Sequence, residues 1–379
     1  MRADMDLYPN AFQLIKDRKK TVELRLNDEK RQKIRVTDPV FFHNSENAYD
    51  VLCCKVKDLH VYKDFYELYK DYDPVSMGYA EGETADPGDM YAYYSKDKID
   101  RYGALAIEIE YIDDLYLCDG HMHLEYGPLN EEYAMRFIEE GISKGLHEVD
   151  ILDHSHRFKE FEGCYKHLKA YDLQAEWLKQ KTKFCNTLDD YKALIETIRK
   201  KDLPIKVRFG LEVCYTSNTE DLLKDILKDV HLDFVTGAVH SVDSILYDMS
   251  FSKELLWDQR SIDDIYRRYY EEVLSLVRSG LFDRLAHPDQ IKLFGHEASY
   301  DLEQTYRKIA ASLNEQGMYG ENNTGIHYRY GHKDIGISEN MLKVFKENKV
   351  KMICASDAHK PEHVGTDIKI ATLRNKGEL

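Results

Sequence analysis

The stretch 115-LYLCDGHMH-123 decides the fold of most of this chain. It is an apolar run that ends in two histidines, and runs of the same kind recur six more times before the C-terminus. The later runs are EVDILDH (148–154), IKVRFGLEVCY (205–215), FVTGAVHSV (234–242), DRLAHPD (283–289), MYGENNT (318–324) and KMICASDAH (351–359). A short apolar run bounded by polar residues is typical of a buried strand, so the chain is predicted to contain seven such strands.

Stretches with helical character separate the seven predicted strands, and they lie at 130–144, 188–201, 219–228, 261–279, 301–315 and 338–348. Strands that alternate with helices in this way form parallel sheets with right-handed connections. We therefore predict an α/β fold in which residues 113–379 form a closed or nearly closed (β/α)7 barrel. The segment 155–187 is longer than an ordinary loop, and we expect it to cover the barrel mouth.

Residues 1–112 have a different pattern and are predicted to form a separate, small, mostly-β domain. A short helix is expected at 12–18, and a tyrosine-rich helical insertion is expected between residues 58 and 94. The expected strands are 21–26, 39–44, 51–62 and 104–112. Two domains also suit a chain of 379 residues, because single hydrophobic cores stop growing at roughly 250–300 residues.

Composition and charge exclude several classes of protein. Hydrophobic residues make up 43% and charged residues 32% of the chain, as in an ordinary folded protein. No apolar run approaches the ~20 residues of a membrane span, and the first residues do not resemble a secretory signal. Scattered cysteines without a C-x-x-C pair indicate a reducing, cytoplasmic location. The net charge of −16 argues against a general nucleic-acid coat, although residues 16–35 hold nine basic and four acidic side chains.

Metal-type side chains gather at the C-terminal ends of the predicted strands, where a β/α barrel places its active site. His121 and His123 are two residues apart, so on a strand both imidazoles project from one face, and Asp357 and His359 repeat this spacing. The other strand ends carry Asp153, His154, Glu212, His240 and His287. A single histidine at a strand end is more often a core or surface residue. Nine ligand-type groups at one rim would place like charges close together, and bound cations would neutralise them. We therefore predict a multinuclear metal site.

The motifs DGHMH, ILDH, GLEV, GAVH, LAHPD and ASDAH resemble, in order and spacing, those of the PHP (polymerase and histidinol phosphatase) superfamily. The resemblance covers about residues 115–375, and the strings HSHRF and NNTG…YRYG make it nearest to the histidinol-phosphatase branch. It implies a distorted (β/α)7, TIM-like barrel that holds two to three divalent ions, which are zinc, manganese or iron. It also implies a hydrolase of histidine biosynthesis.

The resemblance further implies which residues hold each ion. The first ion would take His121, His123, Glu212 and Asp357, and the second would share Glu212 and add His240 and His287. The third would take His154 and His359 with one more ligand, either Glu125 or Asp153, because the chain reads HLEYGP where many members have a further histidine. The residues implied as catalytic are His121, His123, Glu212, Asp357 and His359.

The expected chemistry is attack of a metal-bound hydroxide on a phosphate monoester. Adjacent divalent ions lower the pKa of a bound water to about 7, so no protein nucleophile is needed. Arg157 and Arg329 are expected to hold the phosphate, since arginine binds it bidentately, although a surface ion pair is the alternative for each. His156 and Asn323 are also predicted substrate contacts. His156 could instead line the pocket, and Asn323 could order a metal ligand.

The segment 19-KKTVELRLNDEKRQKIRVTDPVFFHN-44 resembles the ASCH domain, a PUA-like β-barrel, through its Lys-Thr-x-Glu-x-Arg signature, and the resemblance covers about residues 4–112. Relatives of this fold bind RNA or nucleotides, and some small members are amidohydrolases. The resemblance therefore implies a ligand cleft that contains Lys20, Thr21, Glu23 and Arg25. An internal Glu–Arg pair on the strand is an equally weighted alternative.

Three functions are compatible with these observations. The first is a metal-dependent phosphoesterase that acts on histidinol phosphate or a similar small phosphorylated alcohol. The second is a nucleotide or RNA phosphoesterase in which the ASCH-like domain binds the nucleic acid, as the fusion of the two domains suggests. The third is a binding or regulatory protein whose barrel has lost its activity, and the retained ligand set argues against it. No membrane partner is expected.

Overall fold

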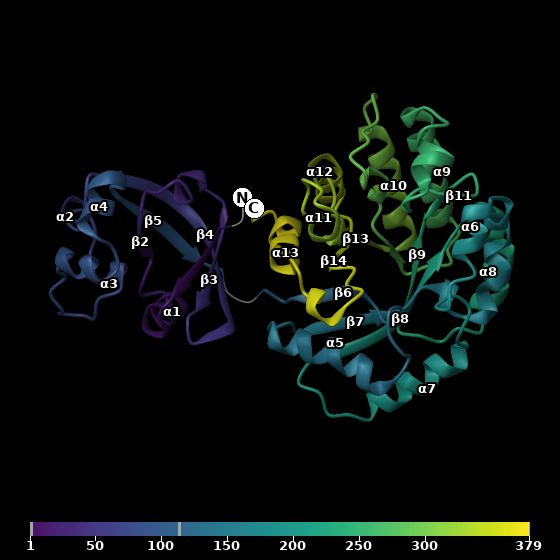
Figure 1. Cartoon of the computed structure of the whole chain (residues 1–379), viewed down its shortest axis with the longest axis horizontal. Helices are drawn as coiled ribbons and strands as arrows, with labels where there is room; N and C mark the ends of the chain where they lie inside the picture. Colours follow the sequence, from purple (N-terminus) through teal and green to yellow (C-terminus); the bar gives the residue numbers. More distant parts are fainter. Residues whose placement is uncertain (1–2, 113–114, 379) are drawn as a thin grey trace. The chain divides into compact units, whose positions relative to one another are not determined.

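The computed structural model describes residues 3–112 and 115–378, without the side chains of residues 47–51. The domain boundary predicted between residues 112 and 113 adjoins residues 113–114, which lie outside the described residues. Figure 1 shows the helices and strands of the chain. No helix among the described residues is both long and apolar enough to cross a membrane.

The first of two compact units contains Met1–Leu115 and Lys376–Leu379 and is built on a five-stranded mixed sheet. The strand order is β1-β3-β4-β5-β2, with β1 and β3 parallel and the other neighbours antiparallel. The strands are β1 (Ala3–Leu7), β2 (Val22–Leu26), β3 (Pro39–Asn44), β4 (Asn47–Tyr62) and β5 (Ala104–Tyr111). The predicted mostly-β fold is confirmed. Strand β1 was not predicted, because only five residues, two of them acidic, form it.

Apolar side chains pack on both faces of this sheet, so the first unit has two cores. One core is closed by α1 (Pro9–Lys16), whose Phe12 and Ile15 are buried. The other core lies under the tyrosine-rich insertion, which contributes Phe65 and Leu68. The insertion is helical only in short pieces, namely α2 (Phe65–Leu68), α3 (Pro74–Met77), η2 (Pro87–Ala92) and α4 (Lys96–Tyr102). Prolines begin α3 and η2, which is the position in a helix where proline is best tolerated.

The second unit, Tyr116–Asn375, is a seven-stranded parallel sheet that curves into a nearly closed barrel (Figure 1). Its order is β14-β13-β12-β9-β8-β7-β6. The strands are β6 (Cys118–His123), β7 (Glu148–Leu152), β8 (Lys206–Cys214), β9 (Phe234–Ala238), β12 (Arg284–Leu285), β13 (Tyr319–Asn323) and β14 (Met352–Ala355). The predicted (β/α)7 barrel is confirmed, and each predicted strand contains an observed one.

The barrel closes where β6 meets β14. Met122 pairs in parallel with Ala358, and the His123 backbone N–H donates to the Ala358 carbonyl at 2.7 Å. Glycine is required at this seam, since a Cβ on Gly120 would lie 2.7 Å from the Ile353 side chain and 2.9 Å from a backbone carbonyl of β14. The closure brings the first and last motifs of the predicted metal site next to each other.

Helices form at all six of the predicted places. These are α5 (Glu131–Ser143), α7 (Leu188–Arg199), α8 (Glu220–Leu227), α9 (Ile262–Arg278), α10 (Glu303–Gln316) and α12 (Glu339–Glu347). Several begin at a side-chain cap, as in α7, where Thr187 and Asp190 form a reciprocal capping box. The helices α11 (Gly325–Tyr330) and α13 (Ile368–Lys376) were not predicted.

The segment 155–187 forms part of the barrel mouth. It consists of η3 (Ser155–Arg157), the 3-10 stretch η4 (Lys159–Ala170), α6 (Asp172–Trp177) and a turn that ends at α7. Trp177 and Lys183 from this segment line the same cavity as the strand-end histidines. The long connection therefore supplies one wall of the site.

Candidate metal centre

The structure brings together nine of the ten predicted metal ligands at the barrel mouth. They line or surround a cavity of about 720 Å³ and come from or follow six strands. The nine are His121, His123, Glu125, His154, Glu212, His240, His287, Asp357 and His359. Parallel strands end at one rim, which is why motifs separated by more than 200 residues converge here.

The first group of ligand atoms surrounds the two β6 histidines. The Nε2 atoms of His121 and His123 lie 2.7 Å apart. Asp357 Oδ1 is 3.3 Å from the His123 Nε2 atom, and Glu212 Oε2 is 3.3 Å from the same nitrogen. Two imidazole nitrogens that face each other at such a distance need a proton or a cation between them. With the two carboxylates this forms a donor set suited to a divalent ion.

A second carboxylate fixes the ring of His121. The His121 Nδ1 atom donates to Glu321 Oε1 at 2.9 Å, so its Nε2 atom carries the free lone pair. Glu321 also accepts the His287 backbone N–H at 3.2 Å. A carboxylate that sets the tautomer of a histidine is a regular companion of metal sites, so the arrangement fits an ion.

The second group is centred on the other oxygen of Glu212. Glu212 Oε1 lies 3.0 Å from His287 Nε2 and 3.3 Å from His240 Nε2. Because Glu212 Oε2 faces the β6 histidines and also lies 2.7 Å from His154 Nδ1, this side chain touches histidines of all three groups. It is fully buried, which leaves no solvent to balance its charge.

The third group contains Glu125 rather than Asp153. Glu125 Oε2 lies 3.3 Å from His154 Nε2 and 3.8 Å from His359 Nε2. The His359 Nδ1 atom donates to the Asp357 carbonyl at 2.9 Å, which again leaves Nε2 as the acceptor that faces the cavity. Of the two carboxylates that the sequence left open, the structure therefore places Glu125 among the ligand atoms.

Asp153 and Arg157 form a buried pair away from the cavity. Arg157 Nη1 donates to Asp153 Oδ2 at 2.8 Å and to the Leu124 carbonyl at 2.8 Å. Its Nη2 donates to the Gly127 carbonyl at 2.9 Å. These bonds correct both predictions: Asp153 is outside the ligand groups, and Arg157 supports the loop on either side of Glu125 instead of facing a substrate.

Of the remaining predicted substrate contacts, two line the cavity and one does not. Arg329 lines the cavity and donates to Asp357 Oδ2 at 3.0 Å, so it lies next to the ligand groups. His156 lines the cavity as well. Asn323 is buried, accepts the Gly325 backbone N–H at 2.9 Å and approaches Glu321, which is the ordering role that the sequence left as its alternative.

Two residues at the mouth were missed by the sequence analysis. Lys183 is buried and donates to Glu125 Oε1 at 2.8 Å, while its ammonium lies over the Trp177 ring at 4.3 Å from the centroid. The other is Glu321, two residues before Asn323. Lys183 lies in an irregular segment, so no periodic pattern could have indicated its direction.

The charges of the cluster are strongly coupled. Burial and the neighbouring His154 and His121 hold the pKa of His123 well below its ordinary value. Although burial favours its neutral form, His154 and His240 hold the pKa of Glu212 well below the ordinary range. An ionised Glu212 thus lies beside a neutral imidazole on β6, as in a set of ligands ready for a cation.

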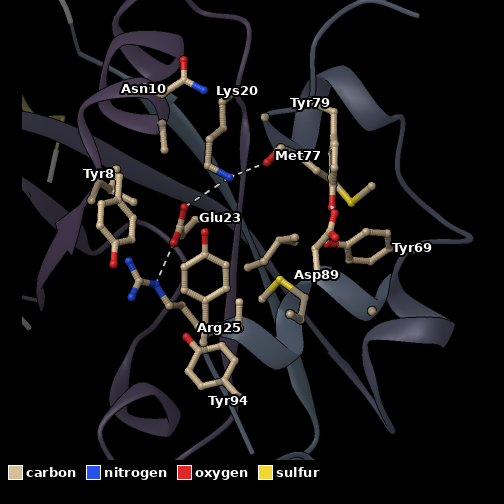
Figure 2. Close-up of a pocket in the computed structure, with 18 of the residues that line it drawn as sticks. Tyr8, Asn10, Lys20, Glu23, Arg25, Tyr69, Met77, Tyr79, Asp89 and Tyr94 are labelled. Carbon is tan, nitrogen blue, oxygen red and sulfur yellow. Dashed lines mark hydrogen bonds and ion pairs between the residues drawn. The ribbon is translucent and has the colours of Figure 1, made fainter. Parts of the chain in front are cut away.

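The first unit contains a separate cavity of about 800 Å³ (Figure 2). Lys20, Glu23 and Arg25 line it, as predicted for the ligand cleft, while Thr21 is exposed and outside the lining. Figure 2 shows Tyr8 and Tyr94 on the Arg25 side of the cavity and Tyr69, Tyr79 and Asp89 on the opposite side. The predicted internal Glu–Arg pair is also present, since Arg25 Nε is 2.7 Å from Glu23 Oε1.

Lys20 is held by three acceptors within this cleft. Its Nζ atom donates to the Met77 carbonyl at 2.6 Å and to the Val22 carbonyl at 2.8 Å, and it lies 3.3 Å from Glu23 Oε2. Burial lowers the pKa of Lys20, against the opposing effect of Glu23. Arg25 contacts Glu23, the Asp6 carbonyl at 2.8 Å and the Tyr94 side chain, so it lies between the strand and the tyrosines of the cleft.

Comparison with known proteins agrees with this architecture. The chain matches the PHP domain model over residues 119–325 and the ASCH domain model over residues 5–113. It is 26% identical to a probable histidinol-phosphatase of Deinococcus radiodurans over 252 residues, covering 66% of this chain and 88% of the relative. It is 25% identical to a histidinol-phosphatase of Bacillus subtilis over 267 residues, covering 65% and 95%.

A solved structure has the same barrel. The crystal structure of histidinol phosphate phosphatase from Lactococcus lactis, complexed with zinc, L-histidinol and phosphate, aligns with a TM-score of 0.53 and 20% identity. The alignment covers 70% of this chain and 94% of that one. At this identity the likeness establishes the fold. The barrel, the order of its motifs and the family match agree, and the chain belongs to the PHP domain family, with an ASCH domain preceding the PHP domain.

Proposed function

We propose that the second unit is a metal-dependent phosphoesterase that hydrolyses a phosphate monoester, histidinol phosphate or a close analogue. The observation that carries this proposal is the position of Glu212, whose two oxygens face separate groups of histidines. Histidinol-phosphatase is the name of the relatives that match most of the barrel. The finer assignments to histidine biosynthesis and a cytoplasmic location rest on the same likeness.

The ligand groups define where ions would bind. We propose His121, His123, Glu212 and Asp357 for the first ion, Glu212, His240 and His287 for the second, and Glu125, His154 and His359 for the third. When bound, divalent ions would supply a nucleophilic water at neutral pH and neutralise charge on the phosphoryl group. Zinc is present in the Lactococcus lactis enzyme, while manganese and iron suit the same donors, so elemental analysis decides the metal.

The protein's own residues orient the reactants. Arg329 lies at the cavity beside Asp357 and can bind a phosphate oxygen while it keeps this contact. Glu321 holds the ring of His121, and Arg157 holds the loop that carries Glu125. Trp177 and Lys183 form the wall that limits solvent access from one side. Together these contacts set the ligands and one anion-binding group before a substrate arrives.

The test is release of phosphate from L-histidinol phosphate by the metal-loaded full-length chain. Glu212→Gln is expected to reduce kcat by about 1,000-fold or more and to lower the metal content, since metal assistance is worth several kcal/mol. Glu196→Gln, an exposed glutamate on α7, is the matched control and should leave both unchanged. A wild-type enzyme that binds metal but hydrolyses no phosphomonoester would contradict the proposal.

For the first unit we propose a flat, polar ligand without phosphate groups, such as a nucleoside, in place of a nucleotide or an RNA strand. The cavity lining contains two cations, Lys20 and Arg25, and four carboxylates. Phosphate groups would therefore meet net negative charge. The tyrosines on both sides favour stacking with a ring, and Arg25 can donate to its polar edge.

Calorimetry separates these ligands. Nucleosides are expected to bind at least about 10-fold more tightly than the matching 5′-monophosphates. In the Arg25→Met variant, ligands with polar rings and ligands with apolar rings should bind with equal affinity. Arg31→Met, a basic residue outside the lining, is the control. Tighter binding of a short RNA than of any nucleoside would instead support a nucleic-acid role.

A further inference from the structure

We propose that Asp248 binds a cationic group of the substrate, so that the barrel mouth selects phosphate esters whose alcohol part carries an ammonium or an imidazolium. This inference rests on the proposed phosphomonoesterase function and specifies the kind of ester that the site prefers. Asp248 lines the cavity that contains the candidate metal ligands, and none of the strand-end motifs contains it.

Asp248 is held on its N-terminal side by a short hairpin. It follows β10 (Ser241–Val242) and β11 (Ile245–Leu246), which begin directly after His240. The Tyr247 backbone N–H donates to the His240 carbonyl at 3.2 Å, and the Tyr247 hydroxyl donates to the Val239 carbonyl at 2.9 Å. The residue before Asp248 is therefore tied to a candidate metal ligand.

Its C-terminal side is fixed as well. The Met249 backbone N–H donates to the buried Ser252 Oγ atom at 2.9 Å, and the Ser252 hydroxyl donates to the Leu246 carbonyl at 2.7 Å. Asp248 thus lies between two anchored residues. Its carboxylate is presented at a defined position in the cavity, which is what recognition of a charged group requires.

Two of the four carboxylates that line this cavity are paired with cations of the protein. Glu125 is paired with Lys183 at 2.8 Å. Asp357 is paired with Arg329 at 3.0 Å. Both also contact imidazoles of the candidate metal groups, so neither is free to bind a substrate cation.

The other two carboxylates differ in their surroundings. Glu176 is 68% exposed and paired with Lys179 at 2.5 Å. Asp248 is half-buried and makes no ion pair with any described side chain. Burial raises the pKa of Asp248, against the opposing effect of His240, as expected for a carboxylate without a cationic neighbour in contact. A ligand cation on its side of the cavity would remove this cost.

The cavity lining therefore contains groups that suit charges of either sign. Arg329 and the candidate ion sites suit the phosphate, while Asp248 suits a positive group on the alcohol. The apolar side chains of Leu246, Met249 and Phe251 line the cavity on the Asp248 segment and can contact the carbon skeleton between the two charges. A substrate with an anionic and a cationic end would be held in one orientation.

The experiment uses three esters with the metal-loaded full-length chain. L-histidinol phosphate carries an ammonium and an imidazole, 2-(imidazol-4-yl)ethyl phosphate carries only the imidazole, and phenyl phosphate carries neither. Asp248→Asn is expected to reduce kcat/KM for L-histidinol phosphate by about 10- to 100-fold, mainly through KM, and to change that for phenyl phosphate by less than about 3-fold. If kcat/KM for the imidazole ester also falls, the imidazolium is the bound cation. If kcat/KM falls for L-histidinol phosphate but not for the imidazole ester, the ammonium is the bound cation.

Two further variants control for charge and position. Asp248→Glu keeps the charge, so its KM for L-histidinol phosphate should lie between those of wild type and Asp248→Asn. Glu254→Gln removes an exposed charge from the same segment outside the cavity lining and should behave as wild type. An equal loss for all three esters with reduced metal content would show that Asp248 serves the ion sites and would overturn the inference. An Asp248→Asn enzyme with unchanged kinetics would also overturn it.

Calorimetric binding of L-histidinol tests the role of Asp248 independently of the proposed phosphoesterase activity. Wild type is expected to bind the free alcohol at least about 10-fold more tightly than Asp248→Asn. That result would support Asp248 recognition even if no ester were hydrolysed, in which case only the phosphoesterase proposal would fail. Equal binding by the two proteins would overturn the role of Asp248 whatever the activity.

Discussion

Glu321 on β13 accepts a hydrogen bond from the Nδ1 atom of His121 on β6 at 2.9 Å, across 200 positions of sequence. This contact orients the imidazole and raises its basicity as a ligand. Glu321→Gln is expected to weaken zinc binding by about 10- to 100-fold with little change in fold, and a competition titration with a chromophoric chelator measures it. Glu315→Gln, an exposed glutamate on α10, is the control. Unchanged affinity in Glu321→Gln would contradict the assigned role.

Arg157 is expected to matter for stability more than for substrate binding. Arg157→Met leaves the Asp153 carboxylate buried without its partner, so the free energy of unfolding should fall by roughly 3–5 kcal/mol. The double variant with Asp153→Asn should recover part of this loss, because no uncompensated charge remains. Urea unfolding of the metal-free chain gives both values. A variant of normal stability with a raised KM would show instead that Arg157 binds phosphate.

Asp150 predicts a pH dependence that is separate from the metal site. One of its oxygens pairs with Arg284 at 2.7 Å, the other has no partner, and burial raises the pKa of Asp150 to about 6. The unfolded pKa is about 3.9, so the folded state binds more protons between these values. The contribution of this group to stability is therefore greatest at low pH and is lost as the pH rises through about 6.

Comparison with Asp150→Asn removes the contribution of the histidines, because they titrate equally in both proteins. The difference in unfolding free energy, wild type minus variant, is expected to fall by about 1–3 kcal/mol between pH 4 and pH 7. Urea unfolding at a series of pH values measures it. A difference that rises over this range would show that the pKa of Asp150 is depressed in the folded protein.

Gly120→Ala should damage the seam of the barrel. The added methyl would meet the Ile353 side chain at 2.7 Å and force β6 away from β14. Overpacking of this kind costs about 1–3 kcal/mol, and we expect weaker metal binding too, because His121 follows directly. Thermal unfolding with and without zinc measures both effects. Gly145→Ala tests a glycine whose Cβ would meet no atom within 4 Å but whose φ of +69° is unfavourable, so it reports backbone strain alone.

The barrel and most of its ligands could be predicted because they follow from local pattern. His121 and His123 share a strand face, and parallel strands end at one rim, so their meeting with Asp357 and His359 needed no knowledge of loops. The choice between Glu125 and Asp153 could not be made in this way. Asp153 adjoins a ligand, yet neighbouring residues at a strand end point in opposite directions, and Asp153 turns toward Arg157.

Residues in irregular segments were the least predictable. Lys183 and Asp248 have no periodic neighbours, so their direction depends on tertiary contacts such as those of Trp177 and Ser252. Arg157 was expected at the cavity because it follows a strand, but four acceptors hold it inward. Position along the chain indicated which rim these residues approach and not which way their side chains turn.

The three acceptors around Lys20 decide what chemistry the first unit can perform. An ammonium whose every hydrogen is already engaged has none left for an incoming oxyanion, and it would have to break contacts with Met77, Val22 or Glu23 before it could lose a proton and attack a carbonyl. We therefore expect the ASCH unit to bind its ligand without changing it chemically.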